Sequence, residues 1–236
     1  MAFFLLFLTT LDVRTNGLYC KDVYTSSRIA CVFTKSLPIQ VEYARRRDTA
    51  SFLIPHPVNN ATVFAASDDL IRAGVEIGMS LYQAQQIAPT AIVITPDEAA
   101  YHAKHDSILT SLKTFSSAIE TVMLGGYLLD VRGLEKLLAG ERSLAEMIQK
   151  TVALASGLSV GVGIATGKFT AQQAAREAPM DGVCVVKVGD EAHFLSSLPI
   201  TVLPHLPGEM RRRLTLLDIY TLGDLAALSK AAVLRQ

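Results

Sequence analysis

The sequence lacks an excess of charge of either sign, a cysteine framework and a long apolar run. Lys plus Arg and Asp plus Glu number 22 each among 236 residues, so any binding to nucleic acid must be local. The three cysteines, Cys20, Cys31 and Cys184, are too few and too scattered for a disulfide framework or a zinc site, which favours a reducing cytoplasm. The apolar run at residues 2–8 is far short of the roughly 20 residues that span a bilayer, so no membrane contact is expected.

Apolar residues are abundant instead. They make up 50% of the chain, enough to bury a substantial core. The first strong strand pattern starts only at Ile29, and residues 1–28 are therefore expected to be a poorly ordered N-terminal extension.

The order of the apolar patterns predicts a mixed α/β fold. Strands are expected at residues 29–33, 119–124, 127–131 and 159–165, and Gly125-Gly126 between the middle two is typical of a tight hairpin. Helical patterns with one apolar face lie between these strands, which gives the ferredoxin-like β-α-β-β-α-β unit.

Shorter elements interrupt and follow this unit. Prolines and Asn59-Asn60 between apolar runs predict a small hairpin at residues 50–66, and a further short strand is expected at 91–94. Capping-box patterns that begin at Ser80, Thr95 and Thr221 predict helix starts.

The string from Gly161 to Lys168 is a glycine-rich turn between a strand and a helix. Val162 and Phe169 stand where a P-loop requires Gly and Ser or Thr, and Thr166 stands where a dinucleotide fingerprint requires Gly. Close packing of strand on helix is the plainer interpretation. A nucleotide-binding protein that uses this turn is kept as an alternative.

Four spaced strings in the same order resemble the Y-family of translesion DNA polymerases. The resemblance implies a palm at residues 29–42 and 90–178, fingers at 43–89 and a thumb at 179–236, with the little-finger domain absent. The strings are Ala66-Ser67 followed by Gly74-Val75, Gly78-Met79-Ser80, Ala84 and Pro89; Ser159 to Ala165 followed by Lys168; Phe194-Leu195, Leu198-Pro199-Ile200; and Tyr220 to Ala226.

The metal-binding positions of that family depart from its pattern. Two Mg²⁺ ions require converging carboxylates, whereas this sequence has Phe33 at the family's first Asp and Gly125 and Gly126 at its Asp-Glu pair. Asp130 lies about 13 Å along the strand from Gly126, at about 3.3 Å per residue. The expectation is therefore a chain that is not an enzyme and needs no cofactor.

The positions that contact the nucleotide triphosphate in the family are also altered. Asp68 and Ile71 replace its Tyr and Arg, so an anion and a hydrocarbon stand in place of a donor and a cation. Lys168 matches the family's palm lysine, and it is a candidate contact for nucleotide or DNA.

The strings around Gly125-Gly126 and from Leu37 to Glu42 resemble the ImuB-type branch of the family. That branch implies an accessory scaffold for DNA repair and mutagenesis at damaged DNA. The implied partners are an error-prone replicative-type polymerase, the sliding clamp and a RecA-like accessory protein.

Weak, sequence-independent DNA binding is expected at the helix start around Pro207, Gly208 and the arginines Arg211, Arg212 and Arg213, because helix-start amides and arginines suit phosphates. A helical packing unit that does not touch DNA is the alternative.

A second alternative for the whole chain is an active polymerase that uses Mg²⁺ and takes its carboxylates from elsewhere, for example from Glu42 or Asp69.

Overall fold

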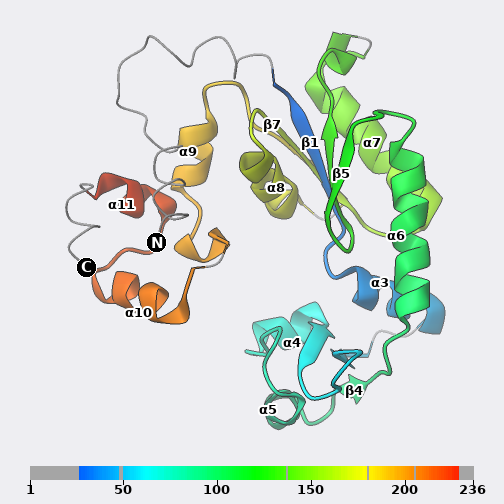
Figure 1. Cartoon of the computed structure of the whole chain (residues 1–236), viewed down its shortest axis with the longest axis vertical. Coiled ribbons are helices and arrows are strands. Elements are labelled where there is room, and N and C mark those ends of the chain that lie inside the picture. Colours follow the sequence, from blue (N-terminus) through cyan, green and yellow to red (C-terminus); the bar gives the residue numbers. More distant parts are fainter. Residues whose placement is uncertain (1–26, 48–49, 137, 180, 205, 229–236) are drawn as a thin grey trace.

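Short apolar strands, most of whose central residues are buried, build a five-stranded sheet at the centre of the chain, shown in the computed structural model of Figure 1. The structure describes residues 27–47, 50–136, 138–179, 181–204 and 206–228. The expected N-terminal extension therefore lies outside the described residues, except for Ser27 and Arg28.

The large sheet has the strand order β5-β6-β1-β7-β8. β1 runs antiparallel to both β6 and β7, so that Phe33 lies opposite Gly126 on one side and Gly161 on the other. The first four strands form the expected ferredoxin-like unit, and β8 adds a strand parallel to β7. The bounds are β1 (Ile29–Phe33), β5 (Ile119–Met123), β6 (Gly126–Asp130), β7 (Gly161–Ala165) and β8 (Val183–Val185).

Helices cover both faces of this sheet. α6 (Glu98–Leu112) and α7 (Glu141–Ser156) cover one face, and α8 (Lys168–Glu177) covers the other (Figure 1). Val32 and Ile164 point into the core with α6 and α7, whereas their neighbours Cys31 and Ala165 pack with α8. This is the two-residue alternation of a strand buried on both faces. The short helix η1 (Leu134–Lys136) precedes α7.

α8 lies unusually close to β7. A Cβ atom at Gly163 would lie 2.2 Å from the Ala175 nitrogen and 2.4 Å from the Ala171 oxygen, and one at Gly161 would lie 2.4 Å from the Ala175 oxygen. The glycines on the strand and the alanines on the helix therefore let the two backbones touch, which confirms the packing interpretation of this turn.

A second, three-stranded sheet with the order β3-β2-β4 lies below the large one in Figure 1, joined to it through α3 (Leu37–Arg46). The hairpin expected at residues 50–66 is present as β2 (Phe52–Pro55) and β3 (Val63–Ala66). β4 (Ile92–Val93) pairs in parallel with β2 and so belongs to this small sheet. Two short helices, α4 (Asp68–Arg72) and α5 (Leu81–Ile87), complete it.

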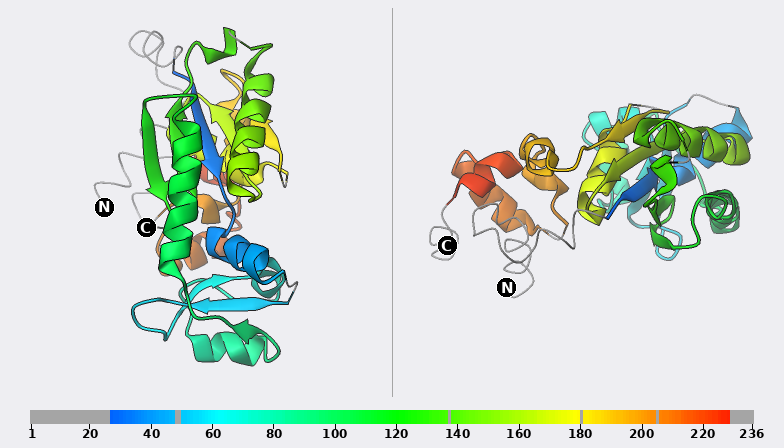
Figure 2. Two further views of the ribbon diagram at one scale, coloured as in Figure 1. Left: turned by 90° about the vertical axis from the view of Figure 1, so that its right-hand side faces the viewer. Right: turned by 90° about the horizontal axis from the view of Figure 1, so that it is seen from above.

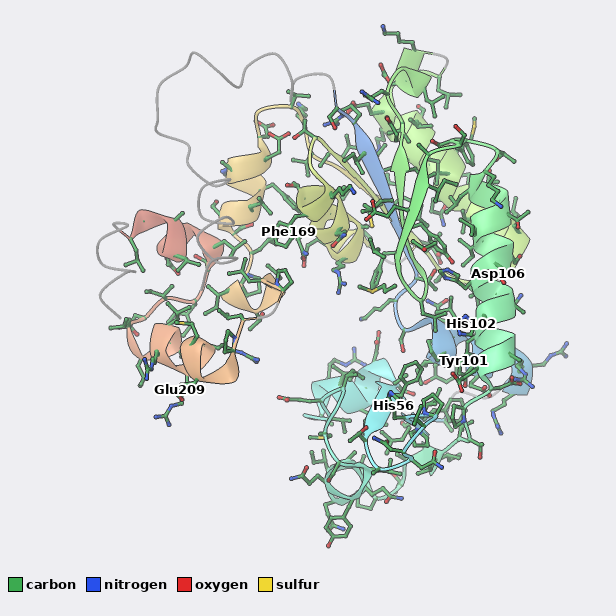
Figure 3. The ribbon with its side chains drawn as sticks, in the orientation of Figure 1. His56, Tyr101, His102, Asp106, Phe169 and Glu209 are labelled. Atoms are coloured by element: carbon green, nitrogen blue, oxygen red, sulfur yellow. The ribbon has the colours of Figure 1, made fainter. Side chains whose placement is uncertain are left out.

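The C-terminal helices form a separate core. Phe169 of α8 packs against this core and joins it to the large sheet (Figure 3). Figure 2 shows that these helices lie to the side of the large sheet. The helices are α9 (Glu191–Ser196), η2 (Ile200–Val202), α10 (Gly208–Leu216) and α11 (Leu222–Ala227), and their buried residues are Leu195, Leu198, Ile200, Leu203, Leu214, Ile219, Leu222 and Leu225.

Two of the three expected helix caps are confirmed. Ser80 caps α5, and Thr221 forms a full capping box with Asp224 at α11. The expected cap at Thr95 is wrong, because the carboxylate of Asp97 accepts from the Ala100 amide and makes Asp97 the N-cap of α6.

The substitution Gly163→Ala tests the contact between α8 and β7. We expect it to lower the free energy of unfolding by more than about 2 kcal/mol, because the new methyl group overlaps backbone atoms that move only with the whole helix. Gly208→Ala is the matched control, since nothing lies within 4 Å of the added Cβ there. Chemical denaturation measures both variants, and equal stabilities would contradict the proposed contact.

Candidate functional site at the tip of the large sheet

The three positions expected to replace the metal ligands do come together. Phe33 ends β1, Gly126 lies opposite it, and Gly125 precedes Gly126 in the β5–β6 turn. The Thr34 amide donates to the Gly125 oxygen at 2.8 Å. We call these four residues, Phe33, Thr34, Gly125 and Gly126, the tip.

The backbone of the tip leaves little room for larger side chains. Gly125 has φ +79°, in the left-handed region, and a Cβ there would lie 3.1 Å from Cβ atoms of Thr34 and Leu37. A Cβ at Gly126 would lie 2.8 Å from Cγ of Met123. Carboxylate side chains at 125 and 126 would therefore require the surroundings of this turn to shift.

A histidine that sequence reasoning missed supports the turn from beneath. The Gly125 amide donates to Nδ1 of His105 at 3.1 Å, and the Tyr127 hydroxyl lies 2.7 Å from the same nitrogen. The hydroxyl is also 2.9 Å from the His105 carbonyl oxygen, and the two rings stack with centroids 4.7 Å apart. The available signal was spacing, because His105 follows Tyr101 by four residues on the buried face of α6.

Burial determines the protonation of this pair. Desolvation lowers the pKa of His105; the charge of Asp106 opposes that shift, and the charge of His102 adds to it (Figure 3). Desolvation also raises the pKa of Tyr127, helped by Asp106. A lowered pKa favours the neutral imidazole, whose unprotonated Nδ1 can accept from the Gly125 amide.

Arg176 lies over the other side of the tip. Its guanidinium carbon is 4.6 Å from the centroid of the Phe33 ring, and its Nη2 is 3.8 Å from Sδ of Met123. Lys168 begins the same helix and forms an exposed ion pair with Glu120 of β5.

Asp68 and Ile71, at the positions that contact nucleotide in the Y-family, both lie on α4. This helix faces the segment that follows β1. Asp68 accepts from Lys35, two residues beyond Phe33, at 2.8 Å. Ile71 is 41% exposed. The structure therefore brings Asp68 toward the tip segment, while Ile71 stays on the surface of the small sheet's helices.

The two carboxylates considered as relocated metal ligands are already engaged. Glu42 is only 2% exposed; its Oε1 accepts from the Tyr101 hydroxyl at 2.9 Å and its Oε2 from Nε of Arg46 at 3.1 Å. Burial, together with the hydrogen bond to Glu42, raises the pKa of Tyr101 to about 12. Asp69 accepts from the Ser51 hydroxyl.

Asp130 lies at the far end of β6, opposite Ile29, and it is paired with Arg132 at 2.5 Å. The hydrogen bond from Arg132 lowers the pKa of this carboxyl group. A pocket of about 940 Å³ lies at this end, with Arg28 and Glu141 in its wall.

The arginines of α10 are exposed. Glu209 pairs with Arg213 at 3.2 Å and lies 3.8 Å from Arg212 (Figure 3), whereas Arg211 has no ion pair among the described residues. Pro207 is the N-cap and Gly208 the first residue of the helix, and no side chain caps its first amides. The sequence prediction of a phosphate-binding surface here remains a prediction.

The tip does not fit a pair of divalent cations. Phe33, Gly125 and Gly126 have no ligating side-chain atom, and within the described ranges no group of three His, Cys, Asp or Glu residues could hold a metal ion. The buried Thr34 hydroxyl lacks a hydrogen-bond partner there, but one hydroxyl does not supply the carboxylate oxygens that Mg²⁺ prefers.

A family comparison identifies the chain. The model of the impB/mucB/samB family matches residues 32–176, which include the whole of the tip. The chain therefore belongs to the impB/mucB/samB family, within the Y-family DNA polymerase superfamily.

Individual relatives agree with this family. A DNA polymerase IV of Dehalococcoides mccartyi is 32% identical over 193 residues, which cover 80% of this chain and 50% of the relative. A DNA polymerase IV of Methanoculleus marisnigri is 30% identical over 164 residues, which cover 70% of this chain and 45% of the relative. The chain spans about half the length of the curated relatives it matches.

Solved structures share the fold. DinB from Sulfolobus solfataricus superposes with a TM-score of 0.76 at 24% identity, covering 87% of this chain and 62% of that one. A ternary complex of Dbh superposes with a TM-score of 0.71 at 25% identity. The match covers 87% of this chain and 61% of the Dbh chain. The expected fold class is confirmed by these Y-family neighbours.

Two expectations from the sequence are contradicted. The relatives are DNA polymerases, so the expectation of a chain that is not an enzyme conflicts with them. The expectation of no cofactor conflicts as well, because polymerases use paired metal ions for phosphoryl transfer. The error came from weighing three substituted positions above the similarity of the remaining chain.

In the part of the chain that the structure covers, no helix has both the length and the apolar character that crossing a bilayer requires.

The contact of His105 with the tip predicts a pH dependence of stability. Its pKa is lowered in the folded protein from the reference value of 6.5, so the unfolded chain binds the proton more tightly. The free energy of unfolding should fall as the pH drops below about 6.5, and His105→Gln should remove this part of the fall. Denaturation curves between about pH 5 and pH 8, the range in which His titrates, measure the free energy of unfolding of both proteins. An identical pH profile in the variant would contradict the assignment.

Proposed function

We propose that this chain binds primer–template DNA and forms the palm, fingers and thumb of a Y-family DNA polymerase that acts in translesion synthesis. The observation that supports this most is the superposition of 87% of the chain on DinB with a TM-score of 0.76. In this proposal the large sheet is the palm, the small sheet with α4 and α5 is the fingers, and the C-terminal helices are the thumb. Action on chromosomal DNA would place the protein in the cytoplasm.

The DNA-contacting surface of the thumb is proposed at the start of α10. Arg212 and Arg213 have side chains that are 75% and 51% exposed, and the space beside Gly208 is open. Exposed arginines next to uncapped helix amides suit phosphate groups without regard to sequence. Lys168 is a second candidate contact, although its ammonium group is shared with Glu120.

Nucleotidyl transfer is proposed to use carboxylates other than those at the substituted positions. Asp68 is the strongest candidate, because its ion pair with Lys35 brings it to the segment that leaves β1. Glu42 is a poor candidate, since its oxygens already accept from Tyr101 and Arg46.

Membership of the ImuB-type branch is a finer proposal. It is supported by Gly125-Gly126 at the tip and by the string from Leu37 to Glu42. This branch would add a separate error-prone polymerase, the sliding clamp and a RecA-like protein as partners.

Binding to DNA tests the first part of the proposal. We expect a labelled primer–template to bind with an affinity that falls with salt, as phosphate contacts require. Replacing Arg211, Arg212 and Arg213 together by Gln should weaken binding about tenfold or more at low salt. Arg142→Gln on α7 is the control, because this exposed arginine pairs with Glu146 on the same helix, away from α10. Absence of wild-type binding would contradict the proposal.

Primer extension tests the second part. With Mg²⁺ or Mn²⁺ and a damaged template, we expect template-directed incorporation that Asp68→Asn lowers at least tenfold, about the scale of losing a charge in the transition state. Asp69→Asn is the matched control on the same helix. DNA binding without incorporation under either metal would contradict the transfer activity and leave the binding role in place.

A further inference from the structure

The positive charge of Arg176 is the strongest unassigned feature of the tip. Its guanidinium lies over the Phe33 ring at 4.6 Å and contacts the sulfur of Met123 at 3.8 Å. Both partners are soft and uncharged, and both belong to the strands that meet at the tip. The side chain thus places a cation at the end of β1 where the resemblance to Y-family polymerases expects a carboxylate.

The charge of Arg176 is also uncompensated. Lys35 and Lys168, the other cations near this face, pair with Asp68 and Glu120. Arg176 has no ion pair among the residues that the structure describes, and it is exposed. Within the described part of the chain, its sequence neighbour Glu177 forms no ion pair with it, and desolvation and then the charge of Glu177 raise the pKa of Cys184 on β8.

The position of Arg176 is fixed by the packing beneath it. The adjacent Ala175 touches Gly161 and Gly163 of β7 through its backbone, so the last turn of α8 cannot slide along the sheet. The Phe33 ring then orients the guanidinium. A planar cation held in this way keeps most of its five N–H donors available, and such a fork matches two oxygens of a phosphate group.

We propose that Arg176 binds a phosphate group at the tip, either of the DNA backbone or of a nucleotide. The inference rests on the proposed function, because it requires DNA or nucleotide at this end of the palm. It adds a recognition element made by Phe33 and Arg176 together. A guanidinium can hold phosphate oxygens without any carboxylate at positions 33, 125 or 126.

Three variants test the proposal. Arg176→Gln removes the charge, Arg176→Lys keeps the charge but loses the fork, and Arg142→Gln removes one exposed charge from α7 on the opposite face of the sheet. Binding of labelled primer–template and of a labelled deoxynucleoside triphosphate is measured separately as a function of salt. Circular dichroism checks that each variant is folded.

If the phosphate belongs to DNA, we expect Arg176→Gln to weaken the binding of primer–template about three- to tenfold. The slope of log K against log salt for primer–template should also become shallower by about 1. Arg176→Lys should restore the slope but only part of the affinity. A loss confined to the triphosphate arm assigns the phosphate to the nucleotide and also supports the proposal.

Two failures are distinguishable. If the wild-type chain binds neither ligand, the proposed function is wrong and the inference falls with it. If the wild-type chain binds, but Arg176→Gln matches Arg142→Gln in affinity and slope in both arms, Arg176 is only a packing residue and this inference alone is overturned.

Discussion

The contact between α8 and β7 is the constraint on which the rest of the structure depends. Gly161 and Gly163 bring the strand within backbone contact of Ala171 and Ala175, and this fixes the height and direction of the helix over the sheet. Because α8 is fixed on the sheet, the side chains at its two ends reach different parts of the protein. Phe169 near its start packs into the C-terminal core, and Arg176 near its end lies over the tip. This one close packing contact thus links the position of the C-terminal helices to the position of Arg176 at the tip.

Electrostatics at the tip differ from those expected of a two-metal site. The tip has a phenyl ring at the end of β1 and glycines at and just before the start of β6, and the cation of Arg176 lies over the phenyl ring. The carboxylate of Asp68, from α4 beside the small sheet, pairs with Lys35. A guanidinium attracts phosphate and repels metal ions.

Two polar contacts between the large-sheet part and the small sheet differ in how well they are shielded from water. Lys35 and Asp68 form an ion pair whose side chains are 70% and 43% exposed, and such a surface pair contributes at most about 1 kcal/mol. The hydrogen bond from Tyr43 to Ser67 is better protected, because Ser67 is fully buried and also accepts from the Phe52 amide at 2.7 Å. The small sheet is thus held against the large sheet mainly by α3, whose buried face packs into the core shared by both parts.

The sequence alone determined the order of the elements, since strand alternation, the Gly125-Gly126 turn and the caps at Ser80 and Thr221 are local signals. It also determined which positions lack carboxylates. Only the tertiary structure decided the sheet to which Ile92 and Val93 belong, the capping of α6 by Asp97, and the contacts of His105 and Arg176 with the tip. These depend on partners 20 or more residues away in several cases, and a periodic pattern records which face of a helix is buried but not what it meets. The expectation of an inactive chain came from three substituted positions, and it conflicts with the polymerase relatives that the rest of the chain resembles.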